Sequence, residues 1–378
     1  MNPHSASRVR WTRVLVCAAL LSGADCNTDR IPGAIYHPPA ERDSAFSIHS
    51  PFWSVDGSRI FFFGHVFGLP GYDLYAVDPL GGVACMLMRD STAKRRPILS
   101  PDGTRIAYLA AELGRHFSQA HVWVMHADGT HPRDLTPFFS NWENIQWSPD
   151  SRAVVFEGGV EDSGAINYQI VRADVETGEI RMLTRGLYGN RFPCFMRDGR
   201  RIAYLSGRIS TPFGGKIWVM DADGSNPRPV DTTSMASTSP RPSPTDNTLY
   251  FYRGLANEPD RGIYSVNIDS VELPASPSSF RFLFRENYLS AGQISPDGFW
   301  LASVEAFNSP RPDLVLLSFD PVGHRRVTTN YDVYLFSEAW SRDARRLVFD
   351  ASDDKTTNSF FVYDVTGGTP RKLQIRRP

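Results

Sequence analysis

Cysteines, excess charge and long apolar runs are all scarce in this chain of 378 residues. It has four cysteines, none in a CxxC spacing, so the sequence supports neither a disulfide framework nor a zinc site. The formal net charge is -1, which lacks the basic excess of a general nucleic-acid-binding protein. Apart from the N-terminus, no segment approaches the roughly 20 apolar residues that span a bilayer. We therefore expect no nucleic-acid partner and no transmembrane segment in the mature chain.

Catalytic signatures are missing as well. The chain contains no G-x-S-x-G pentapeptide of a serine hydrolase, no HExxH and no P-loop. Four histidines step by five from His116 to His131, but two of them, His121 and His126, would stand about 16 Å apart at opposite ends of one strand. We therefore expect no metal site, no cofactor and no catalytic residue.

The N-terminus resembles an export signal. Basic residues precede the apolar run Val14–Leu21, and small residues then fit the rule for cleavage after Ala24. This pattern predicts a signal peptide over residues 1–24 and a polar leader over residues 25–45. Cys26 follows the apolar run and is the alternative, a site for a lipid anchor. The expected location is the periplasm or the cell envelope.

One tetrapeptide recurs seven times through the rest of the chain. SPDG occurs at 100–103 and 295–298, and the relaxed copies begin at Ser54, Ser148, Met196, Ser243 and Ser341. Successive copies start 46 to 52 residues apart. A near-constant period of this length is typical of folds built from one repeated supersecondary unit.

Each copy lies within four short apolar runs, which we label strands a to d in chain order. Strand a precedes the tetrapeptide, and three runs follow it, as in Ile106–Leu109, Val122–Met125 and Arg133–Thr136. The runs are rich in β-branched and aromatic residues, and none has a helical period. Seven such units predict an all-β, seven-bladed β-propeller of four-stranded antiparallel blades over residues 46–376, with six or eight blades as alternatives.

Turn and edge chemistry accounts for the repeated polar residues. SPDG falls at the a–b turn, where Pro presets φ, Asp accepts hydrogen bonds from nearby amides and Gly supplies a positive φ. Strand d carries an arginine in six repeats, as at Arg133 and Arg371. Because strand d is the outer edge of each blade, we interpret these arginines as protection against edge-to-edge aggregation.

The repeat resembles the TolB-type propeller repeat, a relative of the WD repeat. The resemblance rests on in-phase segments such as SPDG at Ser100, IAYLS at Ile202 and IWVMDADGSNPR at Ile217, and it covers about residues 46–375. Similar repeats occur in TolB, in prolyl-oligopeptidase-type peptidases and in oligogalacturonate lyases. TolB resembles a six-bladed propeller behind a separate α/β domain, so the resemblance implies the fold here and not TolB's role.

The leading functional hypothesis is an exported, non-enzymatic propeller that presents loops to a protein or glycan partner in the cell envelope. The b–c and d–a loops share one face and differ in length and sequence, whereas the SPDG face has short, repetitive turns. Aromatic residues and arginine, which dominate binding hot spots, gather on the loop face. The predicted binding residues are Arg95, Arg96, Phe138, Trp142, Tyr188 and Arg191.

Two alternatives stay open. One is a purely structural repeat module. The other is a polysaccharide lyase or hydrolase of the propeller type, for which the resemblance to oligogalacturonate lyases implies several histidines and a glutamine supporting a divalent metal at the central channel. Gln146 and Gln293 lie in strands a, and His49 begins one.

Overall fold

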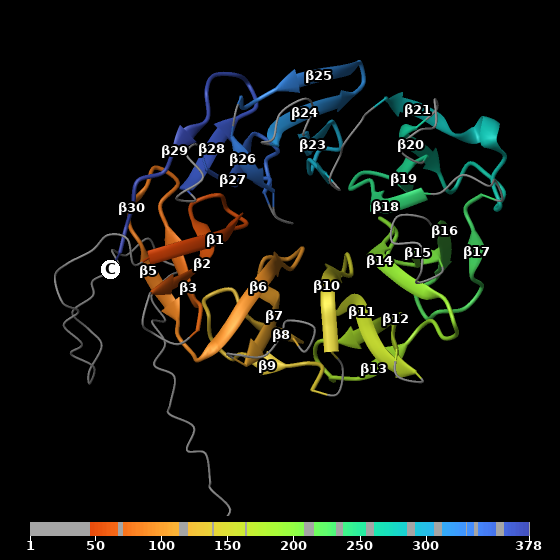
Figure 1. Ribbon diagram of the computed structural model, residues 1–378, viewed down its shortest axis with the longest axis horizontal. Helices are drawn as coiled ribbons and strands as arrows, with labels where there is room; N and C mark the ends of the chain where they lie inside the picture. The colour runs from red at the N-terminus through yellow and green to blue at the C-terminus, as the bar shows by residue number, and fades with distance from the viewer. Residues whose placement is uncertain are drawn as a thin grey trace, which may run out of the picture.

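The computed structural model describes residues 46–377, apart from 67–70, 113–119, 138–139, 163–164, 208–214, 232–236, 255–260, 286–291, 306–311, 330, 336–338 and 353–358. Seven four-stranded antiparallel sheets stand as blades in a ring (Figure 1). This confirms the prediction of a seven-bladed all-β propeller. Within the described ranges, no helix has the length and apolar character needed to cross a membrane. The predicted signal peptide and leader lie outside the described residues.

Chain order matches blade order. Blade 1 contains β1 (Phe46–Trp53), β2 (Ile60–Val66), β3 (Asp73–Val77) and β5 (Cys85–Met88). Blade 2 contains β6 (Thr92–Leu99), β7 (Arg105–Glu112), β8 (His121–His126) and β9 (Arg133–Asp134). Blade 3 contains β10 (Ser140–Trp147), β11 (Ala153–Asp162), β12 (Ala165–Asp174) and β13 (Ile180–Met182). Blade 4 contains β14 (Gly189–Phe195), β15 (Arg201–Gly207), β16 (Lys216–Asp221) and β17 (Arg228–Pro229).

The remaining blades follow the same plan. Blade 5 contains β18 (Ser237–Pro242), β19 (Thr248–Arg253), β20 (Gly262–Asn267) and β21 (Arg281–Phe284), with a 3-10 turn at Pro277–Ser279. Blade 6 contains β22 (Gln293–Ile294), β23 (Trp300–Glu305), β24 (Asp313–Phe319) and β25 (Val322–Arg326). Blade 7 contains β26 (Asp332–Tyr334), β27 (Arg346–Ser352), β28 (Ser359–Asp364) and β29 (Arg371–Lys372).

Middle strands are buried on both faces because each sheet packs between two others. All seven residues of β24 and all five of β3 are buried, which explains apolar runs without strict alternation. Apolar clusters bridge neighbouring blades. One of them joins Phe62 of blade 1 to Phe360 of blade 7, with ring centroids 5.2 Å apart.

The SPDG turns behave as predicted. In blade 2, Ser100 Oγ donates to Asp102 Oδ1 (2.6 Å), and the backbone N–H of Arg105 donates to Ser100 Oγ (3.0 Å). Gly103 has φ +75°, and a Cβ there would come within 2.1 Å of Val55 in the preceding blade. Glycine is therefore required by conformation and by close packing.

The ring is closed by a short pairing that the repeat pattern did not predict. After β29, strand β30 (Ile375–Arg376) pairs in parallel with β4 (Gly82–Val83) of blade 1. The two ends of the ring lie side by side in Figure 1. Trp53 Nε1 also donates to the carbonyl of Ala339 in blade 7 (3.1 Å). Blades 1 and 7 are thus held by backbone, side-chain and apolar contacts.

Several strand-d arginines make contacts between blades that the sequence did not predict. Arg281 Nη2 donates to Phe319 O (3.4 Å), and Arg325 Nη1 donates to Val365 O (2.7 Å). Arg371 reaches from blade 7 to Leu80 O in blade 1 (3.2 Å). Each of these carbonyls belongs to the c–d turn region of the following blade, so these three arginines tie blades 5, 6 and 7 to the blades that follow them.

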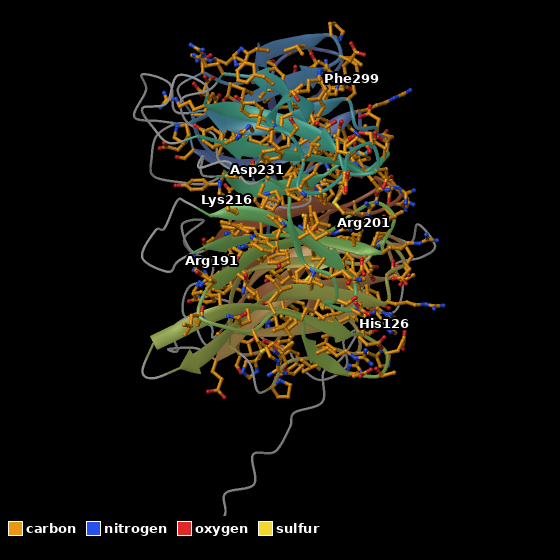
Figure 2. The ribbon with its side chains drawn as sticks, turned by 90° about the vertical axis from the view of Figure 1, so that its right-hand side faces the viewer. His126, Arg191, Arg201, Lys216, Asp231 and Phe299 are labelled. Atoms are coloured by element: carbon orange, nitrogen blue, oxygen red, sulfur yellow. The ribbon has the colours of Figure 1, made fainter. Side chains whose placement is uncertain are left out.

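The propeller has two distinct faces. Figure 2 shows His126, Arg201 and Phe299, which lie at c–d and a–b turns, on one side of the ring. Arg191, Lys216 and Asp231, which lie near d–a and b–c loops, are on the other side. We call these the turn face and the loop face.

Candidate functional site in the central channel

The inner strands surround a cavity of about 1640 Å³ that receives side chains from all seven blades. A regular feature of its wall is the second position of the repeated tetrapeptide. All seven second-position residues line the cavity, namely Val55, Pro101, Pro149, Arg197, Pro244, Pro296 and Arg342. The repeats therefore do converge on one place through this position, although their aspartates serve the turns.

A bulge in strand a shapes the wall further inside. In blade 2 the β6–β7 register shifts between Arg95 and Ile98, and Arg96 has φ +54°. Ser50 and Phe192 occupy the equivalent position in blades 1 and 4 and also have positive φ. Bulges re-aim side chains, and all three residues line the cavity.

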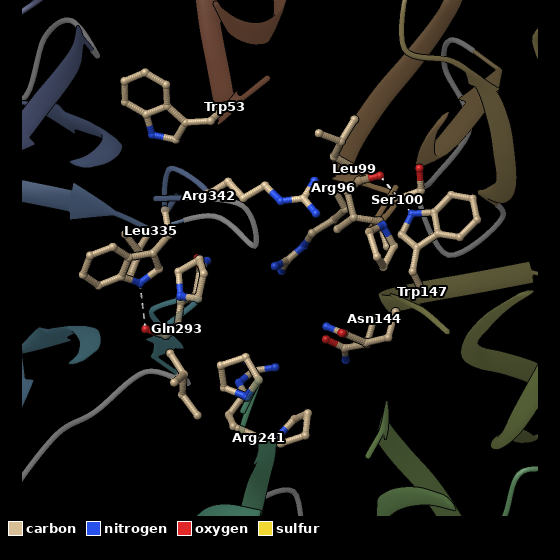
Figure 3. A pocket seen from close by; sticks show the side chains of 18 of the residues that line it. Trp53, Arg96, Leu99, Ser100, Asn144, Trp147, Arg241, Gln293, Leu335 and Arg342 are labelled. Carbon is tan, nitrogen blue, oxygen red and sulfur yellow. Dashed lines mark hydrogen bonds between the residues drawn. The ribbon is translucent and has the colours of Figure 1, made fainter. Parts of the chain in front are cut away.

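Three arginines from separate blades extend into the open centre. Figure 3 shows Arg96 of blade 2, Arg241 of blade 5 and Arg342 of blade 7 reaching inward from different sides. Within the described part of the chain, no carboxylate forms an ion pair with Arg197, Arg241 or Arg342. Burial lowers the pKa of Arg241, and the like charge of Arg96 lowers it further. A bound anion would relieve both effects.

Negative charge in the wall is sparse and already engaged. Asp102 and Asp150 are the carboxylates among the described lining residues. Ser148 Oγ donates to Asp150 Oδ1 (2.5 Å), as Ser100 does to Asp102. Turn hydrogen bonds lower the pKa of both aspartates, so they stay ionised and fixed. The inner part of the wall is therefore cationic.

A histidine stands beside this cationic wall. Burial lowers the pKa of His49 to about 4, and the nearby charges of Arg95 and His65 act in the same direction. Its Nδ1 lies 2.9 Å from Ser50 Oγ, and its ring packs edge-on against Tyr72 with centroids 4.7 Å apart. His49 is thus a neutral imidazole at neutral pH.

A buried carboxylate fixes part of the opposite wall. Glu157 is 2% exposed, and its Oε1 accepts hydrogen bonds from Asn144 Nδ2 (2.5 Å) and from the backbone N–H of Phe192 (2.8 Å). Asn144 and Phe192 both line the cavity. Glu157 therefore positions two wall residues and does not itself face the channel.

The structure divides the predicted binding residues. Arg95 and Arg96 line the channel. Tyr188 is 54% exposed and lies outside the channel wall. The Arg191 guanidinium lies 4.4 Å from the Tyr168 ring centroid and 3.8 Å from Glu157. The predictions for Phe138 and Trp142 stay predictions, because Phe138 and the side chain of Trp142 lie outside the described residues. Arg241, Arg197 and Arg342 were not predicted.

No family model matches the chain. A segment of 154 residues is 28% identical to an uncharacterized protein of Agrobacterium fabrum, and it spans 40% of this chain and 48% of that protein. An oligogalacturonate lyase solved in complex with manganese has a TM-score of 0.67 at 16% identity, covering 84% of this chain and 90% of its own. Prolyl oligopeptidase B of Galerina marginata has a TM-score of 0.66 at 14% identity, covering 87% of this chain and 51% of its own. An oligogalacturonate lyase of Vibrio parahaemolyticus is also similar, with a TM-score of 0.65 at 14% identity.

These neighbours correct the leading functional hypothesis. They are a lyase and a peptidase, so they favour the enzymatic alternative over a non-enzymatic binding protein. At these identities the likeness establishes the β-propeller fold, and the reaction must be argued from the channel itself.

The residues of this channel do not fit a manganese site. Among the described residues, no group of three or more His, Cys, Asp or Glu side chains lies close enough together to hold a metal ion. Gln293 Oε1 accepts a hydrogen bond from the backbone N–H of Ala339 (3.1 Å). His49 and Gln146 stand on blades 1 and 3, in a wall whose inward charges are guanidinium groups that repel a divalent cation.

Proposed function

We propose that this chain is a propeller lyase that cleaves acidic oligosaccharides in its central channel. The observation that carries the proposal is that Arg96 and Arg241 both reach into one cavity whose carboxylates are held in turns. Guanidinium groups bind carboxylates in planar, charge-assisted pairs, and Arg241 has no such partner within the described chain. A uronate chain, the substrate class named for the oligogalacturonate lyases, supplies the missing anions.

The channel's own residues suit elimination. Arg96 and Arg241 would hold one uronate carboxylate and stabilise the negative charge that develops on it as the adjacent carbon loses its proton. His49, neutral and beside Arg95, would accept that proton. The electrons of the broken C–H bond form a C=C bond, the bond to the glycosidic oxygen breaks, and that oxygen takes a proton from solvent. Substrate carboxylates near Arg95 offset its charge and so raise the basicity of His49.

Hydrolysis fits the channel less well. Glycoside hydrolases generally place two carboxyl groups on either side of the scissile bond, one as acid and one as base or nucleophile. Asp102 and Asp150 serve adjacent a–b turns instead, and Glu157 is buried behind the wall. This contrast favours a lyase over a hydrolase.

We further propose that the repeats are of the TolB type and that the protein is exported. The support is the in-phase repeat together with the N-terminal pattern of basic, apolar and small residues. N-terminal sequencing of exported protein is expected to begin at Asp25. A blocked, lipidated Cys26 would favour the lipoprotein alternative, and an intact Met1 in a cytoplasmic fraction would contradict both.

The activity test follows the new double bond. The protein is incubated with oligogalacturonates and other uronate oligosaccharides, and the ultraviolet absorbance of the conjugated C=C bond is recorded alongside new reducing ends. Both signals are expected to rise together, and His49→Gln is expected to lower the rate about 100-fold, as for loss of a general base. The matched control is His324→Gln, because His324 is a partly exposed histidine on the outer strand β25. Reducing ends without absorbance would indicate hydrolysis, and the absence of both signals from folded protein would contradict the proposal.

A further inference from the structure

The two arginines at the second position of the repeated tetrapeptide break an otherwise apolar ring. Five of the seven second-position residues are proline or valine, whereas blades 4 and 7 carry Arg197 and Arg342. Proline presets the turn geometry, so its replacement gives up a local preference. Both arginines are exposed, line the channel and have no ion pair with a described carboxylate.

Arg197 and Arg342 lie at a different depth along the channel from Arg96 and Arg241. Arg241 stands two residues before its tetrapeptide, and Arg96 stands four residues before. Arg197 and Arg342 stand one residue after the start of theirs, at the a–b turns that form the turn face. Because a strand rises about 3.3 Å per residue, three positions correspond to roughly 10 Å along the channel.

We infer that Arg197 and Arg342 form a second anion subsite at the turn-face mouth, through which an extended acidic saccharide enters and reaches Arg241 and Arg96. This inference rests on the proposed function for the identity of the ligand. One subsite would suffice for a single uronate, but cationic groups at separate depths match a chain that carries one carboxylate per sugar. The mouth subsite should therefore add affinity only for ligands long enough to span both levels.

The test measures binding as a function of ligand length, in a His49→Gln background that limits turnover. Isothermal titration calorimetry compares digalacturonate with hexagalacturonate for this protein and for the same protein with Arg197→Gln and Arg342→Gln. We expect the double substitution to weaken hexamer binding about tenfold, as for the loss of charge-assisted contacts, and to leave dimer binding within about twofold. The slope of log affinity against log salt should become shallower for the hexamer alone.

The matched control replaces Arg200 and Arg345 by glutamine. These exposed arginines lie three residues further along the same two turns but do not line the channel. Equal losses for dimer and hexamer, no loss for either, or the same loss in the control would overturn the mouth subsite. The absorbance assay tests the proposed lyase activity separately. Length-dependent binding without turnover would support the mouth subsite and contradict the lyase assignment.

Discussion

The outer strands and the inner strand of each blade follow different rules. The middle and outer strands use similar chemistry in several blades. Middle strands such as β3 and β24 are buried, and the outer-strand arginines Arg325 and Arg371 bond to the next blade. The inner strands have similar backbone conformations, but their side chains differ from blade to blade. Two positions before each tetrapeptide the residues are Phe52, Ile98, Gln146, Cys194, Arg241, Gln293 and Ala339.

This difference separates residues that the repeated unit needs from residues that serve one site. A residue that recurs in every copy is explained by the unit, because each blade needs it for its own turn or its own packing. A residue that departs from its column has no such explanation. Arg241, Arg197 and Arg342 are departures of this kind, and all three lie in the channel wall.

The largest expected effect comes from removing blade 7 and so opening the ring. Truncation after Leu335 removes most of blade 7 together with β30. Apolar surfaces that include Trp53 and Phe62 would then lose their partners Phe360 and Leu373. Because a closed ring has no free blade faces, we expect aggregation or loss of the cooperative thermal transition, measured by circular dichroism and size-exclusion chromatography. A monomer that melts like the full chain would contradict ring closure by blade 7.

Arg241→Met should separate function from stability. It removes a half-buried charge that has no carboxylate partner within the described chain, so the melting temperature should stay the same or rise. Lyase activity should fall about 100-fold, as when one preorganised donor to a developing anion is lost.

The comparison variant is Arg346→Met, at the contact between blades 7 and 1. Arg346 stacks over the Trp53 ring at 4.4 Å and donates to Gly57 O (3.3 Å), so its loss should lower the melting temperature and spare activity. The reverse pattern in this pair would mean that Arg241 is a structural residue.

His49 should make stability depend on pH. Its folded pKa of about 4 lies below the ordinary 6.5, so the unfolded chain binds this proton more tightly. Stability should therefore fall as pH is lowered from about 6.5 to 4, and His49→Gln should flatten that slope. Urea midpoints across this pH range measure it, with His324→Gln as the control. An unchanged slope would show that His49 titrates normally.

A smaller effect is expected at the hydrogen bonds between inner strands. Trp147 is buried, and its Nε1 donates to the carbonyl of Ile98 in the preceding blade (3.1 Å). Trp147→Phe should cost about 1 kcal/mol of unfolding free energy, the usual net value of one such bond. Trp300 is partly exposed, and Trp300→Phe is the control. A larger loss for the control would contradict an inter-blade role for Trp147.

The fold could be predicted because its signal is repeated seven times. Turn residues, strand runs and spacing were each present in several copies, so an irregular copy such as Met196 did not obscure the pattern. The parallel closure by β30 and β4 could not be predicted, since it occurs once. Nor could the inter-blade hydrogen bonds of Arg325 and Arg371, because their carbonyl partners belong to another blade.

The site was harder to predict for a related reason. Its arginines Arg96, Arg197, Arg241 and Arg342 come from four different blades, and only ring closure brings them together. Arg96 was predicted with Arg95 as a binding residue of the loop face, whereas Lys94 near it is buried and donates to Asp90 and to Tyr72 O (2.8 Å). The usable signal was the alignment of the seven copies, in which Arg241 is the one charged residue of its column.

Anion binding in the channel is tested most directly by comparing a charged ligand with its neutral counterpart. Trigalacturonate and its fully methyl-esterified form are titrated into the His49→Gln protein at low and moderate salt. We expect that the acid binds, that its affinity falls as salt rises, and that the ester binds at least about tenfold more weakly. Equal affinity for acid and ester, unaffected by salt, would contradict a channel that binds anionic saccharides through its inward-facing arginines.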